Sequence, residues 1–331
     1  MTDKTDDDQT QNAVDAAEEV LRPSLLRDFR GQPQATELIE MAVAGARQRG
    51  EAPDHTLLYG PPGLGKTTLA SILAREMGGG FKVVMGPSIT RAGDLASILV
   101  GLEPNDVLLI DEIHRLPPQA GEIAYGAMED FRLDIVTGDQ GGQARAVSIP
   151  LPRFCLVGAT TRPGMLAGPL RNRFHLTVSL VPYGNEDMTA IVARSAGILG
   201  IDLDEGAAAE VALRSRGTPR LSNGYLRRIR DHAAYVGTTR VGLDLVRAAF
   251  DRLGVDADGL RVSDRRYLDV LSGRFAGRPV GLKTLAAALG EDIDTLEHEV
   301  EPYLVQHGFV DRTARGRLPG PRRRPQGTLG V

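Results

Sequence analysis

The sequence predicts an α/β fold in which helices cover both faces of a parallel sheet, followed by a small helical domain and a winged helix. Three observations predict it. Short apolar strands alternate with helical segments up to about residue 182, which is typical of a parallel sheet covered on both faces. Helical periodicity with few strand signals then continues to residue 254. Three helical segments and a terminal β-element follow within 260–318, in the order found in a winged helix.

The first domain is predicted to span 21–183. Helices are expected at 33–49 and 66–77. Short buried strands are expected at 56–59, 82–85, 107–110 and 154–158. Strand-like segments at 132–136 and 144–149 flank Asp139-Gln140-Gly141-Gly142, which indicates a β-hairpin with a flexible tip.

The pattern changes near Pro182, where the second domain is predicted to begin. Residues 184–254 are expected to form a small helical domain, and 255–259 a short linker. The third domain is predicted over 255–318. Its helices are expected at 264–274, 282–289 and 294–306, with a strand and turn at 309–317.

The composition is that of an ordinary globular chain. Of its 331 residues, 42% are hydrophobic and 25% are charged, which excludes whole-chain disorder, a collagen-like repeat and a disulfide scaffold. The strongest apolar run, at 107–110, is far shorter than a membrane span, and the acidic N-terminus is unlike a targeting peptide. The single cysteine, Cys155, lies in an apolar stretch that predicts burial. We therefore expect a soluble, cytoplasmic protein with no membrane partner.

Charge is concentrated at the two ends of the chain. Residues 1–20 carry seven acids and one lysine, whereas 312–331 carry six arginines and no acid. We expect an acidic disordered tail at 1–20 and a basic disordered tail at 319–331. Charge alone leaves open whether the basic end contacts phosphates or is simply solvated.

The strongest chemical signal is the segment GPPGLGKT at 60–67. It matches G-x-x-x-x-G-K-[ST] and lies between a predicted strand and a predicted helix, as this phosphate-binding motif requires. Gly63 and Gly65 allow backbone N–H groups to close around phosphate oxygens at a helix N-terminus. Lys66 is expected to reach the β- and γ-phosphates of ATP, and the Thr67 hydroxyl is expected to ligate Mg²⁺.

A pair of carboxylates follows the apolar run at 107–110. Asp111 and Glu112 are thereby delivered to the C-terminal end of a parallel strand, where ligands bind in open α/β sheets. We expect Asp111 to hold the Mg²⁺ shell and Glu112 to activate a water for attack on the γ-phosphate. We expect His114 to be a solvated or helix-capping residue rather than a base.

Three later segments supply a hydroxyl or a guanidinium group. A hydroxyl of Thr160 or Thr161, closing the next strand, is placed to position the attacking water. Arg173 is either an arginine finger for a neighbouring subunit or part of a surface salt bridge. Arg220 follows a proline that suits the first turn of a helix. A positive side chain is unusual at a helix start, and a bound phosphate would account for it.

The predicted winged helix contains both acidic and basic candidates. Its third helix carries Glu297, Glu299 and Glu301, which disfavours reading of the major groove by this helix. The presumed wing carries the better candidates for contact with the DNA backbone or minor groove, which are Arg312, Arg315 and Arg317.

Together these motifs resemble the RuvB family, the AAA+ motors of bacterial Holliday-junction branch migration. The resemblance runs from about residue 21 to residue 317, and it is carried by LRPSLLRDF, GQPQ, DHTLLYGPPGLGKTTLA, GDLASIL, DVLLIDEIHRL, AMEDFRLDIV, GATTR, PLRNRF, SRGTPR, LRRIRD, PVGLKTLAAALGE, EPYLVQHGFV and RTARGR. It implies an AAA+ P-loop domain, a lid domain and a winged helix, with ATP and Mg²⁺ as cofactors. It also implies a homo-oligomer, a hexameric ring acting on duplex DNA at Holliday junctions.

The resemblance also implies roles for individual residues. Lys66, Thr67 and the adjoining Thr68 match Walker A, and Asp111 and Glu112 match Walker B. The sensor threonine, the arginine finger and the second sensor arginine correspond to Thr161, Arg173 and Arg220. Positions that frame the adenine nucleotide, or lie near it, correspond to Leu21, Arg22, Tyr183, Glu129, Asp130 and Phe131. The hairpin at 132–149 matches the element that docks a RuvA-type partner, and the DNA-contacting arginines match Arg312 and Arg317.

The chain also departs from the family pattern. The departures are Arg30, Gly126, His175, Gly224, Ala314 and a hairpin tip without the usual proline. None removes a catalytic group, and together they indicate a divergent copy. Two alternatives therefore stay open: a clamp-loader-like or protein-remodelling AAA+ ATPase, and a non-catalytic ATP-binding ring scaffold.

Overall fold

The computed structural model of the chain describes residues 20–137 and 145–322. The chain divides into two compact units, one comprising residues 1–199 with 217–224 and the other residues 200–216 with 225–331. Of the expected tails, residues 1–19 and 323–331 lie outside the described residues. The expectation of disorder from residue 319 is wrong for 319–322, because Pro319 ends strand β11 (Gly316–Pro319), and Gly320 and Arg322 donate backbone hydrogen bonds to the carbonyls of Phe309 and Gly308. Within the described ranges, no helix has both the length and the apolar character needed to cross a membrane.

A five-stranded parallel sheet, ordered β2-β3-β6-β1-β7, forms the centre of the first unit. Its strands are β1 (Thr56–Tyr59), β2 (Phe81–Met85), β3 (Val107–Asp111), β6 (Cys155–Thr160) and β7 (Leu176–Ser179). The apolar residues of β3 are fully buried because both faces of the sheet are covered. The predicted parallel sheet is therefore confirmed, and the edge strand β7 adds to the four predicted strands.

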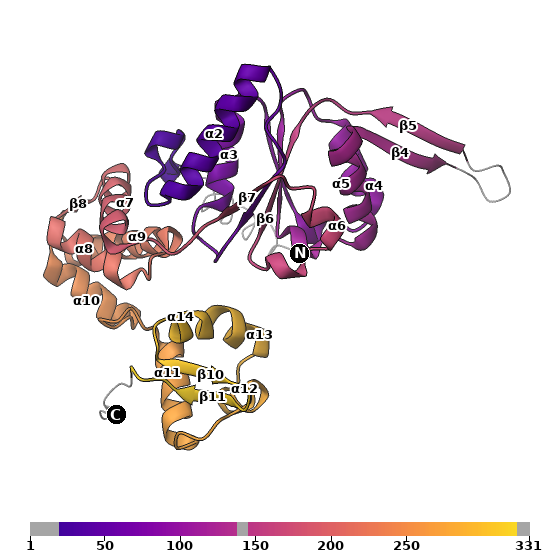
Figure 1. The fold of residues 1–331 in the computed structure, drawn as a ribbon. Helices are drawn as coiled ribbons and strands as arrows, with labels where there is room; N and C mark the ends of the chain where they lie inside the picture. Colours follow the sequence, from indigo (N-terminus) through magenta and orange to yellow (C-terminus); the bar gives the residue numbers. More distant parts are fainter. Residues whose placement is uncertain (1–19, 138–144, 323–331) are drawn as a thin grey trace, which may run out of the picture. The chain divides into compact units, whose positions relative to one another are not determined.

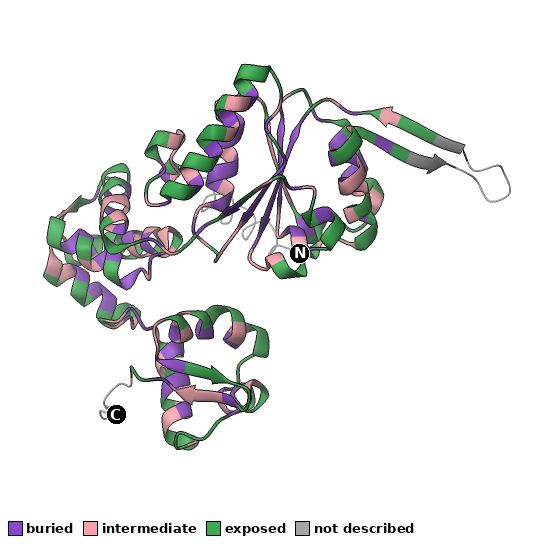
Figure 2. Ribbon diagram, in the orientation of Figure 1, coloured by how far each residue is buried: buried purple, intermediate pink, exposed green. Residues whose placement is uncertain are grey.

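Helices cover the two faces of this sheet (Figure 1). One face carries α2 (Pro33–Arg49) and α3 (Lys66–Met77), and the other carries α4 (Ala92–Val100) and α5 (Pro118–Asp130). The buried surfaces of α4 and α5 meet Leu108, Ile110 and Phe154 in one apolar core (Figure 2). The other elements of this unit are the 14-residue helix α7 (Asn185–Ile198) and the short η1 (Leu26–Asp28), η2 (Gly86–Ser88), η3 (Ile113–Arg115), η4 (Pro163–Met165) and α6 (Gly168–Arg171).

The predicted β-hairpin is present and projects away from the sheet (Figure 1). It is formed by β4 (Arg132–Thr137) and β5 (Arg145–Pro150), which pair antiparallel with Leu133 opposite Ile149. Phe131 adopts a left-handed conformation, φ 49°, and so turns the chain from α5 into β4. The expected flexible tip at 139–142 lies outside the described residues.

The second unit joins lid helices to a winged helix. Its lid elements are β8 (Asp202–Leu203), α8 (Glu205–Arg214), the later part of α9 (Pro219–Val236), β9 (Arg240–Val241) and α10 (Leu243–Leu253). Its winged-helix elements are α11 (Val262–Asp269), the π-helical η5 (Val270–Arg274), α12 (Leu282–Leu289), α13 (Ile293–Thr295), the π-helical η6 (Leu296–Val300), α14 (Glu301–Gln306), β10 (Val310–Thr313) and β11 (Gly316–Pro319). The last two strands form the antiparallel wing, so the predicted order of three helical segments and a β-element is confirmed.

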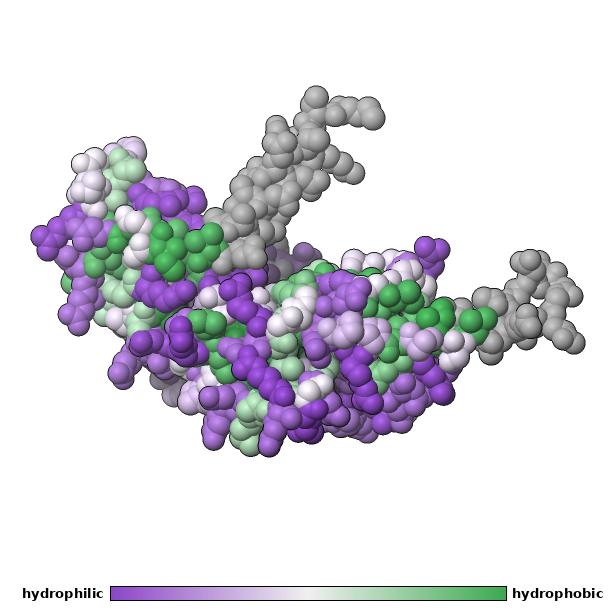
Figure 3. Space-filling view, turned by 90° about the horizontal axis from the view of Figure 1, so that it is seen from above, coloured by the Kyte–Doolittle hydropathy of each residue, from purple (hydrophilic) through white to green (hydrophobic). Residues whose placement is uncertain are grey.

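The surface is mostly hydrophilic, with smaller apolar areas between charged side chains in the view from above (Figure 3). This distribution agrees with a mean hydropathy of −0.16 and a charged fraction of 25%. The winged helix has an apolar core of its own, centred on Tyr267, Leu271, Leu285 and Leu304. Its fold therefore rests on internal packing as well as on its attachment to the lid helices.

Candidate nucleotide site and wing

A cavity of about 600 Å³ lies within the first unit, at the C-terminal ends of the parallel strands. It brings together the segment before α2, the P-loop, the end of β3, α7 and the start of α9. The predicted site residues that line it are Leu21, Arg22, Gly63, Gly65, Lys66, Thr67, Thr68, Asp111, Glu112, Tyr183 and Arg220. Segments up to 199 residues apart in the sequence thus converge on one space of nucleotide size.

Two glycines give the P-loop its shape. Gly63 has φ 78° and Gly65 has φ 103°, which are conformations that side chains rarely tolerate. An added Cβ at Gly65 would lie 3.0 Å from the ring of Phe29, and one at Gly63 would lie 2.9 Å from Cβ of Arg220. The loop is therefore closely covered on two sides, and only glycine fits at these positions.

Lys66 points back into the P-loop. Its side chain donates hydrogen bonds of 2.9 Å to the carbonyl oxygens of Gly60 and Pro61. Burial lowers the pKa of Lys66, and the nearby carboxylates of Asp111 and Glu112 act in the opposite direction. The ammonium is thus held inside the loop that would surround the phosphates.

Thr67 and Asp111 form an oxygen-donor pair at the bottom of the cavity. The Thr67 hydroxyl lies 3.5 Å from Oδ2 of Asp111. A hydroxyl and a carboxylate suit Mg²⁺, which binds few protein oxygens and keeps waters and phosphate oxygens for its other positions. The described residues contain no group of three or more acidic, histidine or cysteine side chains that could hold a metal ion. With two protein oxygens only, the Thr67–Asp111 pair fits a cation whose other ligands are phosphate oxygens and waters.

Glu112 adopts a strained backbone conformation, with φ 51°. Its N–H donates a hydrogen bond of 2.9 Å to Oδ1 of the preceding Asp111. Left-handed residues other than glycine cost energy and cluster at functional sites. This conformation places the carboxylate of Glu112 at the cavity, beside Thr67 and Asp111.

The expectation of a solvated or helix-capping His114 is wrong. Its side chain is only 4% exposed, because the turn from Glu112 into η3 directs it back toward β6. Its Nδ1 lies 2.8 Å from Oγ1 of Thr160 and 3.3 Å from Oε2 of Glu112. Burial lowers the pKa of His114, and the Glu112 carboxylate opposes this effect. A buried imidazole thus links the proposed base to the end of the neighbouring strand.

Several predicted residues do not line this cavity. They are Thr161, Glu129, Asp130, Phe131 and Arg173. Arg173 lies 2.7 Å from Oε2 of Glu129 and donates a hydrogen bond of 2.5 Å to the Tyr125 hydroxyl. The salt bridge that the sequence left open is therefore present. Phe131 instead packs near His55 and Phe154 in an aromatic cluster.

Several residues of the cavity wall were not predicted from the sequence, among them Asp28, Phe29, Ala190, Ile191, Arg194 and Asn223. Arg194 donates a hydrogen bond of 2.8 Å to the carbonyl of Leu21 across 173 residues of sequence. The Tyr183 hydroxyl likewise donates to the carbonyl of Leu64 at 2.9 Å. Only the tertiary fold brings these residues together, so no local pattern could have indicated them.

The wing arginines share one buried carboxylate. Glu301 is fully buried and accepts hydrogen bonds from Nε of Arg312 at 2.8 Å, Nε of Arg317 at 2.9 Å and the Tyr267 hydroxyl at 2.6 Å. Burial by itself would raise the pKa of Glu301, but the hydrogen bonds from Arg317, Tyr267 and Arg312 outweigh burial and lower it. Arg312 keeps 41% of its side chain exposed and Arg317 only 18%. The Glu301 charge is therefore neutralised inside the fold.

Comparison with known proteins identifies the family. Residues 21–180 match the family model described as the Holliday junction DNA helicase RuvB P-loop domain. Residues 183–256 match the RuvB AAA lid domain, and residues 257–322 match the RuvB C-terminal winged helix domain. The chain belongs to the RuvB family. Its AAA+ architecture and membership of a family of ATP-binding Holliday-junction DNA helicases follow from these matches.

Solved RuvB structures have the same fold. The Thermotoga maritima RuvB Holliday junction branch migration motor is 42% identical and superposes with a TM-score of 0.82, covering 92% of this chain and 96% of that one. A mutant of the same Thermotoga maritima protein, also 42% identical, gives a TM-score of 0.83 over 91% of this chain and 96% of that one. The similarity therefore extends over nearly the full length of both proteins.

The departures from the RuvB pattern fall at positions that the structure accommodates. Arg30 lines the cavity. An added Cβ at Gly126 or Gly224 would meet no atom within 4 Å. His175 is exposed and lies 3.9 Å from Asp54, and Ala314 is exposed in the wing. Of these five positions, only Arg30 borders the nucleotide cavity.

Proposed function

We propose that this chain hydrolyses ATP in the 600 Å³ cavity and uses the energy to drive branch migration of Holliday junctions in recombination and repair. The observation that carries the proposal is the convergence of the P-loop, the Asp111–Glu112 pair and Arg220 on that one cavity. Membership of the RuvB family supplies the reaction class. The three domains are proposed to divide at 183 and 254, as expected from the sequence.

The residues around the phosphates would have distinct roles. Lys66 exchanges its two carbonyl partners for β- and γ-phosphate oxygens. Thr67 and Asp111 would hold Mg²⁺, which neutralises charge that develops on the phosphates. Glu112 accepts a proton from the attacking water, and Thr161 at the end of β6 helps to orient that water. Arg220 contributes positive charge from the start of α9.

The nucleotide base and the subunit boundary involve a second group of residues. Leu21, Arg22 and Tyr183 line the cavity beside Arg30, and they would frame the base. Arg173 lies with Glu129 apart from the cavity lining of its own chain. We therefore assign Arg173 to a neighbouring subunit's γ-phosphate, with the segment 129–131 beside it, in a hexameric ring.

The winged helix would grip duplex DNA through its wing. Arg312 and Arg315 are exposed enough to reach phosphates, whereas Arg317 mainly supports the wing through Glu301. Phosphate contacts position a protein on DNA without reading sequence, which suits a motor that must move along any sequence. The hairpin formed by β4 and β5 would dock a RuvA-type junction-binding protein.

Steady-state ATP hydrolysis, measured with and without four-way junction DNA and a RuvA-type partner at two salt concentrations, tests this proposal. We expect stimulation by the junction that falls at high salt, because phosphate contacts release counterions. Robust hydrolysis that is indifferent to DNA would indicate a protein-remodelling ATPase instead. ATP binding without turnover would indicate a non-catalytic scaffold.

A further inference from the structure

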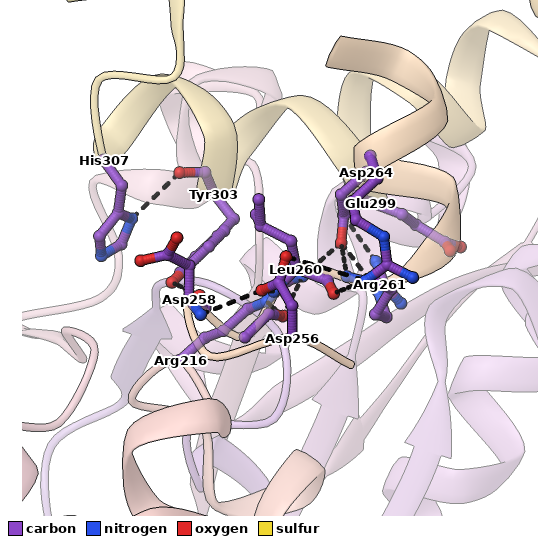
Figure 4. Close-up of polar contacts among 11 residues, drawn as sticks. Arg216, Asp256, Asp258, Leu260, Arg261, Asp264, Glu299, Tyr303 and His307 are labelled. Atoms are coloured by element: carbon purple, nitrogen blue, oxygen red, sulfur yellow. Dashed lines mark hydrogen bonds and ion pairs between the residues drawn. The ribbon is translucent and has the colours of Figure 1, made fainter. Parts of the chain in front are cut away.

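Arg216 lies at the end of a lid segment and contacts the winged helix and the turn that precedes it (Figure 4). Its Nε donates a hydrogen bond of 2.7 Å to the carbonyl of Gly259, and its guanidinium pairs with the fully buried Asp264. The guanidinium also lies 4.1 Å from the ring centroid of Tyr303 in α14. Three separate elements of the second unit therefore hold one side chain.

The turn at 255–259 is ordered by its own hydrogen bonds, although the sequence suggested a plain linker. Asp256 accepts a hydrogen bond of 2.8 Å from the N–H of Leu260, and the Tyr303 hydroxyl donates to the carbonyl of Asp258 at 2.8 Å. Gly259 has φ 73°, and an added Cβ there would lie 2.9 Å from the carbonyl oxygen of Arg214. The lid backbone and the turn are thus in direct contact, which leaves little freedom at this junction.

Arg216 is also the first residue of the segment that carries Arg220. Arg216 has a strained φ of 54°, and Gly217 follows with φ 64°. Gly217 accepts a hydrogen bond of 3.0 Å from the N–H of Tyr183, and both Tyr183 and Arg220 line the nucleotide cavity. Five consecutive residues therefore connect contacts at the cavity to contacts at the winged helix.

We propose that Arg216 is a positioning residue of the motor, which fixes the winged helix to the lid helices so that the two move together. The ion pair with Asp264 and the stacking on Tyr303 hold Arg216 against the winged helix. A buried guanidinium that moved away from these two residues would be left unpaired, which is energetically costly. A rigid connection of this kind passes a displacement of the lid helices on to the whole winged helix.

The test variant is Arg216→Gln with Asp264→Asn, which removes both charges together and leaves no buried ion unpaired. The amide oxygen that Asp264→Asn introduces can still accept the hydrogen bond that Arg261 N–H now donates to Asp264 at 2.7 Å. The matched control is Arg214→Gln with Glu210→Gln. Arg214 is equally buried, pairs with Glu210 and stacks 4.7 Å from Phe250 in the lid helices. It also donates a hydrogen bond of 2.9 Å to the carbonyl of Val255, so this control perturbs the start of the turn but removes no contact with the winged helix.

The first readout is the distance between two spin labels, at Asp251→Cys in α10 and Lys283→Cys in α12, both of which are exposed sites. Native Cys155 stays unlabelled because it is buried and burial raises its pKa to about 12. We expect a narrow distance distribution in the native protein and in the control, and a broad one in the test variant. This readout does not depend on the proposed function.

The second readout, which rests on the proposed function, is the number of base pairs moved per ATP hydrolysed. We expect DNA-free ATP hydrolysis to be unchanged in the test variant and its coupling ratio to fall about tenfold, within the usual range of coupling between sites. The control should keep the native ratio. A narrow distribution in the test variant, or a broad one with native coupling, would overturn the proposal. If the native chain failed to move junctions, the proposed function would be wrong. The spin-label distances would still test whether Arg216 fixes the winged helix to the lid helices.

Discussion

Gly63 and Arg220 are in contact through their backbones. The N–H of Arg220 lies 3.4 Å from the carbonyl oxygen of Gly63, and an added Cβ at Gly63 would lie 2.9 Å from Cβ of Arg220. The start of α9 therefore rests directly on the P-loop. Any side chain at Gly63 would separate the two segments that are proposed to hold the phosphates.

Gly63→Ala should accordingly weaken ATP binding by about tenfold, or ~1.4 kcal/mol. Gly78→Ala is the matched control, because Gly78 has a similar φ of 68° but an added Cβ there meets no atom within 4 Å. The control should lose only about 1 kcal/mol of stability through backbone strain, with native affinity. Titration with a fluorescent ATP analogue checks both variants. Equal affinities of Gly63→Ala and the native chain for the ATP analogue would show that the contact between Gly63 and Arg220 does not contribute to ATP binding.

Glu112→Gln should keep nucleotide binding and lose ATP turnover by about 100-fold or more, because the amide cannot accept the proton of the attacking water. The variant retains the hydrogen bond from the backbone N–H of residue 112 to Asp111, so Asp111 stays in place beside Thr67. Single-turnover hydrolysis and analogue binding together measure the two effects. Near-native turnover would show that another residue is the base.

Arg173→Ala and Lys66→Ala should each abolish ATP hydrolysis, but mixtures of the two variants should recover part of it. Recovery is expected because a mixed ring contains interfaces in which one subunit supplies an intact Lys66 and its neighbour an intact Arg173. ATPase activity measured across mixing ratios checks this. Activity that stays absent at every ratio would rule out the finger acting between subunits.

Arg315→Ala and Arg317→Ala should have different effects. Arg315 is exposed, so its loss should lower the slope of log affinity for DNA against log salt by about one and leave stability unchanged. Arg317→Ala should destabilise the winged helix by ~3 kcal/mol, because Glu301 loses one of its two guanidinium partners. Salt-dependent DNA titrations and thermal unfolding separate the two. Native stability in Arg317→Ala would contradict a supporting role.

His55 should make the first unit sensitive to mild acid. Burial lowers its pKa from 6.5 to about 4, with a hydrogen bond to the Met128 carbonyl acting in the opposite direction. The unfolded chain then binds more protons between these values, so the stability that neutral His55 contributes is complete above pH 6.5 and is lost as the pH falls toward 4. The loss should reach about 3 kcal/mol.

Chemical unfolding of the native chain and His55→Gln at pH 7.5 and pH 5 measures this effect. The native chain should lose more stability than the variant on acidification, because only the native chain carries the buried imidazole. Equal losses would assign the acid sensitivity to other groups. An NMR titration of the His55 ring, expected to show no protonation above about pH 5, provides an independent check.

The sequence predicted the parallel sheet and the P-loop because their signals are local. The apolar run of β3, the glycines at 63 and 65 and the Asp111–Glu112 pair all lie within short segments. Edge strand β7 gave a weak signal, because only Val178 of its four residues is buried. Its place in the sheet is fixed by pairing with β1 rather than by its own pattern.

Other features depended on contacts between distant parts of the chain. His114 is buried against Thr160, which lies 46 residues away in the sequence, and Arg194 reaches Leu21 across 173 residues. Glu301 lies in a helical segment with Glu297 and Glu299, and the sequence pattern alone does not separate the buried Glu301 from the partly exposed Glu297. Glu301 can be buried because Arg312 and Arg317 on the wing pair with it. The sequence of the helix itself contains no sign of these partners.

The most direct test of the central claim is to follow a fluorescently labelled four-way junction with the native chain and a RuvA-type partner, in the presence of ATP and Mg²⁺. Our account predicts ATP-dependent conversion of the junction into its separated duplexes at a rate that follows ATP hydrolysis. It also predicts no conversion with a non-hydrolysable analogue or with Glu112→Gln. ATP hydrolysis without any movement of the junction would contradict the account.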